Sequence, residues 1–263
     1  MGPRIVLLVL VLVFSTALDA SAQRGAASDS EKEAEETRDE ILDAANFSGL
    51  KMRSIGPALV SGRVVDLAVH PDDPATYWVG VASGGLWKTT NSGTTFEPIF
   101  DSQGSYSIGA LALDPNDPKV LWVGTGENNS QRSVPYGDGV YKSIDGGANF
   151  ENVGLENSEH IGMIKVDPRD SDVVWVAAQG PLWSAGGDRG LYKTEDGGET
   201  WELKLEIDEH TGASEVWLDP RDPDVMYAVS YQRARRVWTL INGGPGSGLW
   251  KSTDGGETWR ELT

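Results

Sequence analysis

Two stretches of the sequence decide the fold: GLYKTEDGGETW at residues 190–201 and GLWKSTDGGETW at residues 248–259. Two looser copies precede them, GLWKTTNSGTTF at residues 85–96 and GVYKSIDGGANF at residues 139–150. Each copy starts as a short apolar strand ending in Lys and runs into an eight-residue box, S/T-x-D-x-G-x-T-W, in which Asn91 replaces Asp in the first copy. Self-similarity of this kind indicates a repeat architecture.

Two further apolar runs, joined by a turn rich in Pro and Asp, lie upstream of each box, as in IGALALDPNDPKVLWVGT at residues 108–125. Each repeat therefore predicts four short antiparallel strands, labelled A to D in chain order. Units of this kind, repeated at about 50 residues, are typical of propeller blades. The sequence thus predicts an all-β protein, a β-propeller of four-stranded antiparallel blades, with four blades present.

Apolar residues recur at equivalent places in the repeats, which predicts that they pack between blades. The strand-A row is Leu67, Leu111, Ile164 and Val216, and the strand-B row is Trp78, Trp122, Trp175 and Tyr227.

The box acids, Asp145, Asp196 and Asp254, are interpreted as structural. A tight hairpin leaves backbone N–H groups without partners, and a carboxylate just before a permissive Gly can accept them while the aromatic residue packs beneath. The boxes lack the additional clustered carboxylates that a calcium loop requires.

Only one interval varies between repeats. The distance from the strand-B aromatic to the strand-C Lys is 10, 20, 18 and 24 residues, whereas the other intervals are nearly constant. In a four-stranded meander, the B–C connections emerge on the face opposite the A–B turns and boxes. Variable loops on a rigid scaffold commonly carry binding residues, so this face is the expected binding face.

The three long B–C connections, residues 124–139, 177–190 and 229–248, supply the candidate ligand-binding residues. These are Glu127, Asn128, Arg132, Tyr136, Asp138, Trp183, Asp188, Arg189, Tyr231, Arg233, Arg235, Arg236 and Trp238. The arginine triplet either clamps an anionic ligand or pairs with acids of its own loop. Trp183 and Trp238 either stack on sugar rings or fold inward.

Residues 1–22 have the features of a signal peptide: an early Arg, an apolar run at residues 5–18 and Ala-Ser-Ala before residue 23. An acidic, disordered linker is expected at residues 23–46 and the propeller at residues 47–263. A secreted or periplasmic location follows, with no membrane insertion after cleavage. The net charge of −18 disfavours nucleic acid. The expected partner is an extracytoplasmic protein, peptide or polysaccharide, and no cofactor or metal is expected.

The boxes and the opening IGPALVSGRVVDLAVHP resemble the BNR or Asp-box repeat superfamily, and most of all the sortilin-type N-terminal propeller of large secreted bacterial glycosyl-hydrolase-like proteins. The resemblance implies a ring of more than four blades. Residues 47–55 resemble an unpaired strand D, so the chain is expected to be the N-terminal part of a longer protein and the ring incomplete.

Catalytic motifs of the superfamily are not matched. Arg53 and Pro57 lack the spacing that sialidases use before their first box, and Ala82 stands where xyloglucanase-like enzymes have an acid. The three histidines lack metal-ligand spacing and are interpreted as structural or exposed. Two hypotheses remain: a binding propeller, and a glycoside hydrolase whose carboxylates lie in the loops or in further blades.

Overall fold

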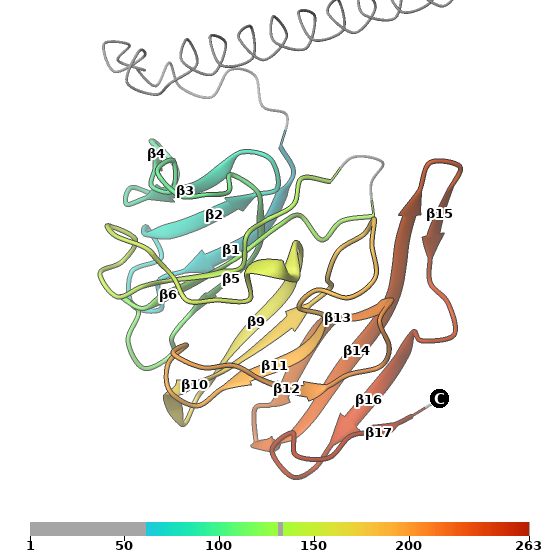
Figure 1. Ribbon diagram of the computed structural model, residues 1–263. Coiled ribbons are helices and arrows are strands. Elements are labelled where there is room, and N and C mark those ends of the chain that lie inside the picture. The colour runs from blue at the N-terminus through green and yellow to red at the C-terminus, as the bar shows by residue number, and fades with distance from the viewer. Residues whose placement is uncertain (1–61, 131–133, 263) are drawn as a thin grey trace, which may run out of the picture. The chain divides into compact units, whose positions relative to one another are not determined.

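The computed structural model describes residues 62–130 and 134–262, which belong to one compact unit, Pro57–Thr263. The expected signal peptide, acidic linker and first strand lie outside the described residues. Four antiparallel sheets follow one another along the chain (Figure 1). Each has four strands in sequential order, and the last sheet has a fifth strand that pairs off this path. The all-β prediction and the four blades are therefore confirmed.

The strands of each blade are as follows. Blade one has β1 (Val64–Val69), β2 (Tyr77–Val81), β3 (Gly85–Thr89) and β4 (Glu97–Pro98). Blade two has β5 (Ile108–Leu113), β6 (Leu121–Thr125), β7 (Val140–Ser143) and β8 (Glu151–Asn152). Blade three has a 3-10 turn, η2 (Glu156–Ser158), then β9 (Ile161–Asp167), β10 (Asp170–Ala178), β11 (Gly190–Thr194) and β12 (Glu202–Leu205). Blade four has β13 (Thr211–Asp219), β14 (Asp222–Arg236), β16 (Gly248–Ser252) and β17 (Arg260–Glu261), and β15 (Thr239–Asn242) pairs with the end of β14.

The first strands of the blades are neighbours in space: β1 contacts β5, β5 contacts β9 and β9 contacts β13. These strands form the inner side of an arc. Over the described residues the arc does not close into a ring (Figure 1).

The strand-B row forms the core between blades, as predicted. Trp78, Trp122 and Trp175 are at most 1% exposed, whereas Tyr227 of the last blade is only half-buried. In the strand-A row, the prediction is wrong for Leu67, which is 55% exposed. Leu111, Ile164 and Val216 are buried against the blade that precedes theirs. Among the described residues no blade precedes blade one, so Leu67 lacks this contact.

Each seam between blades joins a strand-C Lys to the next box. Lys88 Nζ donates to the Gly146 carbonyl, and Lys142 Nζ to the Gly197 carbonyl, both at 2.8 Å. The same ammonium groups lie 5.2 and 4.8 Å from the ring centroids of the strand-B tryptophans. A cation held over an indole ring and bonded across the seam is partly desolvated, and this strengthens the cation–π contact.

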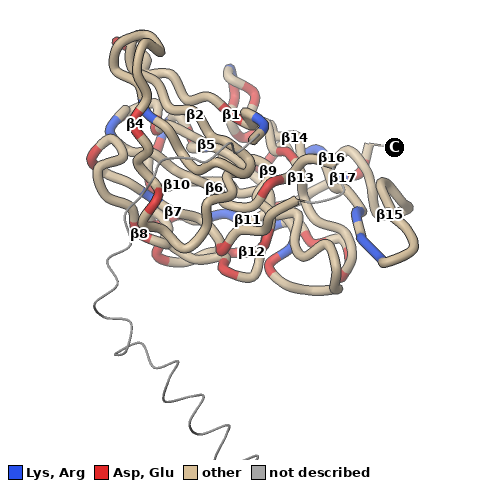
Figure 2. The backbone as a smooth tube through the Cα atoms, turned by 90° about the horizontal axis from the view of Figure 1, so that it is seen from above, with Lys and Arg blue, Asp and Glu red and all other residues tan. Residues whose placement is uncertain are grey.

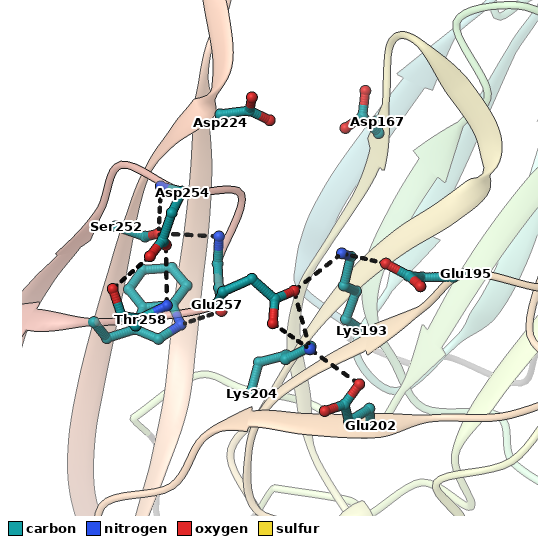
Figure 3. A network of polar contacts seen from close by, with 12 residues as sticks. Asp167, Lys193, Glu195, Glu202, Lys204, Asp224, Ser252, Asp254, Glu257 and Thr258 are labelled. Atoms are coloured by element: carbon teal, nitrogen blue, oxygen red, sulfur yellow. Dashed lines mark hydrogen bonds and ion pairs between the residues drawn. The ribbon is translucent and has the colours of Figure 1, made fainter.

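The boxes have the hydrogen bonds predicted for them. In the fourth box, Asp254 Oδ1 accepts from Ser252 Oγ at 2.7 Å and from Thr258 N at 3.0 Å (Figure 3). These donors favour the charged form and lower the pKa of Asp254 to about 2. Asp145 Oδ1 accepts the equivalent hydrogen bonds from Ser143 Oγ and Asn149 N. The box acids therefore close the hairpins, and their carboxylate oxygens accept hydrogen bonds from the protein itself.

The B–C connection of blade four is not the loop that was expected at residues 229–248. β14 continues to Arg236 and pairs with β15, with Arg233 opposite Asn242 and Arg236 opposite Thr239. Only two residues, 237 and 238, separate the paired runs, and this length allows backbone hydrogen bonds to close a hairpin. Arg233, Arg235 and Arg236 therefore lie on a paired strand, in a hairpin whose strand β15 is at the edge of the described blades (Figure 2).

Candidate ligand-binding face

The antiparallel register of each blade places its B–C connection opposite its A–B turn and box, as predicted. This surface is called the B–C face. The connections from one blade to the next emerge on it as well. Gly85 N, at the blade-one B–C turn, donates to the Tyr106 carbonyl at 2.8 Å, which places the segment between β4 and β5 on this face.

Four of the connections on the B–C face, taken from all four blades, each present an exposed aromatic side chain. These side chains, called the aromatic track, are Tyr106 (64% exposed), Tyr136 (71%), Trp183 (60%) and Trp238 (82%). The sequence left open whether the two tryptophans fold inward, and the structure shows both exposed. Large exposed aromatic groups gathered on one face are typical of interaction sites.

Two hollows adjoin beneath this track. The first has a volume of about 540 Å³ and lies between Tyr106 and Tyr136. The second, of about 660 Å³, extends from Tyr136 to Pro181, close in the chain to Trp183. Both are lined by Tyr136 and Gly137, so together they form one extended depression across the first three blades.

The segment between the hollows is fixed by buried hydrogen bonds. Ser107 Oγ, fully buried, donates to the Pro135 carbonyl at 3.0 Å. Gly137 N donates to the Glu159 carbonyl at 2.7 Å. The backbone on both sides of Tyr136 is thus held in place. A loop held in this way loses little backbone freedom when a ligand binds, which favours affinity.

Two predicted acids turn toward the protein. Asp138, in the wall of the first hollow, accepts from Tyr141 Oη at 2.7 Å and from Thr125 Oγ1 at 3.2 Å. Burial, followed by this bond, raises the pKa of Tyr141. Glu127 is fully buried, and its Oε1 accepts from Arg63 Nε at 2.7 Å. Glu127 is therefore a buried carboxylate beneath the face, paired with Arg63, whose side chain is 42% exposed.

Three acids line the second hollow: Glu156, Glu159 and Asp188. Asp188 Oδ2 accepts from Asn157 N at 2.9 Å. Glu159 lies just beyond η2, with φ 54 and ψ −33, a sparsely populated conformation for a residue other than glycine. Burial raises the pKa of Glu159 and outweighs the opposing attraction of Arg189. A carboxyl group with a raised pKa beside an exposed depression is a candidate proton donor.

The buried arginines support the loops. Arg233 donates to the carbonyls of Asn128, at 3.2 Å, and Asn129, and so ties the blade-two loop to the blade-four hairpin. Arg189 donates to four carbonyls of its own loop. Burial lowers the pKa of both guanidinium groups. For the arginine triplet the sequence left two roles open, clamping an anionic ligand or pairing with acids of its own loop. The hydrogen bonds of Arg233 go instead to backbone carbonyls.

The hairpin is also joined to the blade-three loop. Arg235 N donates to the Leu182 carbonyl at 2.7 Å, and Arg236 Nη1 to the Trp183 carbonyl at 3.3 Å. These bonds hold the loop of Trp183 against the hairpin whose tip carries Trp238. The aromatic track therefore continues from the second hollow onto blade four.

A buried histidine lies beneath the face. His160 is 2% exposed, and its Nδ1 has no hydrogen-bond partner within the described residues. Burial, and then the charge of Arg233, lowers the pKa of His160 to about 4. Its burial is consistent with the interpretation of this histidine as structural, and its neutral form makes the fold less stable in acid.

The structure divides the predicted residues by burial. The exposed ones are Tyr136, Trp183 and Trp238, and the buried ones are Glu127, Arg189 and Arg233. The half-buried ones are Asn128, Asp138, Asp188, Tyr231, Arg235 and Arg236, while Arg132 lies outside the described residues. Sequence reasoning missed Arg63, Tyr106 and Glu159, which lie outside the length-variable intervals that guided it.

Within residues 62–130 and 134–262, no group of three or more His, Cys, Asp or Glu side chains could hold a metal ion. The same residues contain no helix long and apolar enough to cross a membrane.

No family model matches the chain, and no curated protein matches it by sequence. Solved structures of GH74 glycoside hydrolases are similar to it in fold. An ancestral GH74 enzyme aligns with TM-score 0.60 and 19% identity over 76% of this chain and 25% of its own. The GH74 enzyme of Niastella koreensis aligns with TM-score 0.55 and 21% identity over 74% of this chain and 28% of its own. The GH74 xyloglucanase of Xanthomonas campestris aligns with TM-score 0.54 and 20% identity over 75% of this chain and 29% of its own.

The described residues therefore form an all-β assembly of propeller blades, similar in fold to GH74 propellers. This chain spans between a quarter and three tenths of the length of those enzymes. The sortilin-type and Asp-box resemblance remains a prediction from the sequence.

Proposed function

We propose that the protein is an extracytoplasmic β-propeller that binds an extended glycan along the aromatic track of its B–C face. The observation that carries this proposal is the series of four exposed aromatic side chains on one face, of which Tyr106 and Tyr136 line two adjoining hollows. Sugar rings have apolar faces that pack on aromatic rings and hydroxyl groups that bond to polar groups nearby. A depression that continues across several blades suits a chain of sugars better than a compact molecule.

The charges of the face favour a neutral ligand. The buried guanidinium groups of Arg189 and Arg233 donate to backbone carbonyls, and Glu127 is paired with Arg63. These groups would have to break internal bonds to recognise an acidic peptide, at the cost of leaving buried partners unsatisfied. A neutral polysaccharide therefore fits the face better than an acidic peptide, one of the partners that the sequence also allowed.

Trp183→Ala should weaken glycan binding about tenfold, which corresponds to about 1.4 kcal/mol. The reason is that Trp183 is 60% exposed in the free protein, so its removal deletes contact area without opening the core. The measurement is titration calorimetry with neutral oligosaccharides selected on a glycan array that includes xyloglucan fragments, since one similar structure is a xyloglucanase.

The matched control is Phe96→Ala, which removes an aromatic group 44% exposed in the first box, at the opposite end of the blade. This variant should bind glycan as the unaltered protein does. Equal losses in both variants, or unchanged affinity in Trp183→Ala, would contradict binding along the track.

Hydrolysis of the bound glycan is the second candidate function. It is favoured by Glu159 and Asp188, which line the same hollow, with the pKa of Glu159 raised. In such a reaction a protonated carboxyl group donates to the leaving oxygen, and an ionised one acts on water or on the sugar. Glu159 would be the acid and Asp188 the base or nucleophile.

Glu159→Gln should lower turnover at least about a hundredfold and leave glycan affinity nearly unchanged, because the amide keeps the shape but donates no acidic proton. Turnover should also fall as pH rises through the pKa of Glu159, since the acid must be protonated. Release of reducing sugar measures both. If the unaltered protein releases none from a glycan that it binds, the hydrolase candidate is wrong and the binding proposal stands.

A further inference from the structure

A guanidinium group bridges the seam between blades three and four, at the end of the blades that carries the A–B turns and the boxes. Arg169 Nη2 lies 2.7 Å from Asp167 Oδ2 of its own blade, and Arg169 Nη1 lies 2.9 Å from Asp224 Oδ1 of blade four. The two carboxylates lie on opposite sides of the seam (Figure 3). All three side chains line a hollow of about 360 Å³. The arginine therefore joins two acids that the fold brings close together.

Glu257 of the fourth box is a third acid at this seam, and it too has basic neighbours. Glu257 lies 3.1 Å from Lys204 and 3.9 Å from Lys193 (Figure 3). Each of the three acids at this seam therefore has a basic side chain beside it.

The seam between blades two and three keeps the acids but lacks two of the bases. Asn116 stands in the place of Arg169. Val153 stands in the place of Lys204. The Asn116 amide donates to Ser171 Oγ of blade three, at 3.4 Å. The residues equivalent to the three acids are Asp114, Asp172 and Glu199.

Asp114 has the same orientation as Asp167 but no base to meet. Asp114 Oδ1 accepts from Asn116 N at 2.8 Å, and Asp167 Oδ1 accepts from Arg169 N at the same distance. The second oxygen of Asp114, Oδ2, is therefore directed toward the place that the guanidinium group occupies in the next seam. Asp114 is 1% exposed, and its Oδ2 has no hydrogen-bond partner among the described residues. A buried carboxylate without a partner is costly, so this oxygen favours a bound positive group.

The base that this seam retains, Lys142, does not replace the arginine. Its Nζ donates to the Gly197 carbonyl at 2.8 Å and lies over the strand-B tryptophan of its own blade. On the other side of the seam, Gly197 N donates to the Asp172 carbonyl at 3.0 Å, and Gly255 N makes the same bond to Asp224. Asp172 is therefore placed in its turn as Asp224 is.

We propose that a hard divalent cation, Ca²⁺ or Mg²⁺, binds in this seam and bridges blades two and three as Arg169 bridges the next pair. Asp114 Oδ2 is its buried ligand, and Asp172 faces it from blade three. The Asn116 carbonyl and the Ser171 hydroxyl offer further oxygen atoms, the donor type that such cations prefer. Within residues 62–130 and 134–262, no three His, Cys, Asp or Glu side chains could hold one ion together, so water completes its shell. The spacing of residues in the sequence does not indicate this site, because its ligands come from two blades.

Thermal unfolding of the purified chain, freed of metal with a chelator, tests the proposal. Addition of about 10 mM Ca²⁺ or Mg²⁺ should raise the unfolding midpoint by about 3–10 °C, which corresponds to a dissociation constant of about 0.1–1 mM. The ion that gives the larger shift is the preferred one. Potassium chloride at the same ionic strength should give a much smaller shift, because it only screens charge.

Asn116→Arg gives the sharpest outcome. The new arginine supplies the group that Arg169 supplies in the next seam, so this variant should unfold at a higher temperature without metal and should lose the shift caused by the divalent cation. Asp114→Asn should lose the shift as well. Asp222→Asn, which removes an exposed acid from the blade-four turn, should keep it. No shift in the unaltered protein, or a shift that persists in Asn116→Arg and Asp114→Asn, would overturn the proposal.

Discussion

Gly256→Ala should lower the free energy of unfolding by about 2–4 kcal/mol, measured by urea denaturation. A Cβ at this position would lie 2.1 Å from Cη2 of Trp175, a ring fixed in the seam by Trp259. Overpacking of this kind costs about 1–3 kcal/mol. The backbone also has φ +84, which adds about 1 kcal/mol for a residue with a side chain.

The control is Gly186→Ala. Gly186 has a similar φ of +76, but no atom lies within 4 Å of its added Cβ, so only the backbone cost of about 1 kcal/mol should appear. In a Trp175→Ala background the clash is removed, and Gly256→Ala should then cost no more than Gly186→Ala. Equal losses for the two glycines in the unaltered background would show that the second box glycine does not mediate docking between blades.

The unaltered protein should lose about 2 kcal/mol of stability between about pH 7 and pH 4.5 because of His160 alone. The folded state lowers the pKa of this imidazole from 6.5 to about 4. Between these values the unfolded chain binds a proton that the folded protein does not, so stability falls as pH falls. His160→Gln cannot titrate and should lack this part of the loss.

Urea denaturation at about pH 7, 5.5 and 4.5 measures the difference between the two proteins, and carboxylates common to both cancel. His210→Gln is the control, because the side chain of His210 is 41% exposed. It should keep the pH dependence of the unaltered protein. A His160→Gln variant with an unchanged pH dependence would mean that folding does not lower the pKa of His160.

The repeats made most of the fold predictable. The same residue types recur at equivalent spacing, and this pattern predicts the strands and hairpins from local interactions alone. It also predicts the hydrogen bonds of the box carboxylates and the burial of the strand-B tryptophans. The exposure of Leu67 was not predictable in this way, since burial there depends on a neighbouring blade and not on the residue itself. The hairpin of β14 and β15 was missed because a long interval was equated with a loop.

The candidate site was predictable only in outline. The variable intervals located the B–C face and its exposed aromatic residues Tyr136, Trp183 and Trp238. Tyr106 and Glu159 lie in connections of constant length, and they join the site only through the arrangement of successive blades. Whether a loop arginine meets a ligand or a backbone carbonyl depends on contacts between loops about 100 residues apart, as for Arg233 with Asn128 and Asn129.

Hydrogen exchange of backbone amides, with and without the tightest-binding glycan from the array, tests the binding face most directly. The predicted result is slower exchange at residues 104–107, 134–139 and 181–188, with no change in the box hairpins at residues 143–150, 194–201 and 252–259. Protection confined to the box hairpins or to the inner strands would contradict the account.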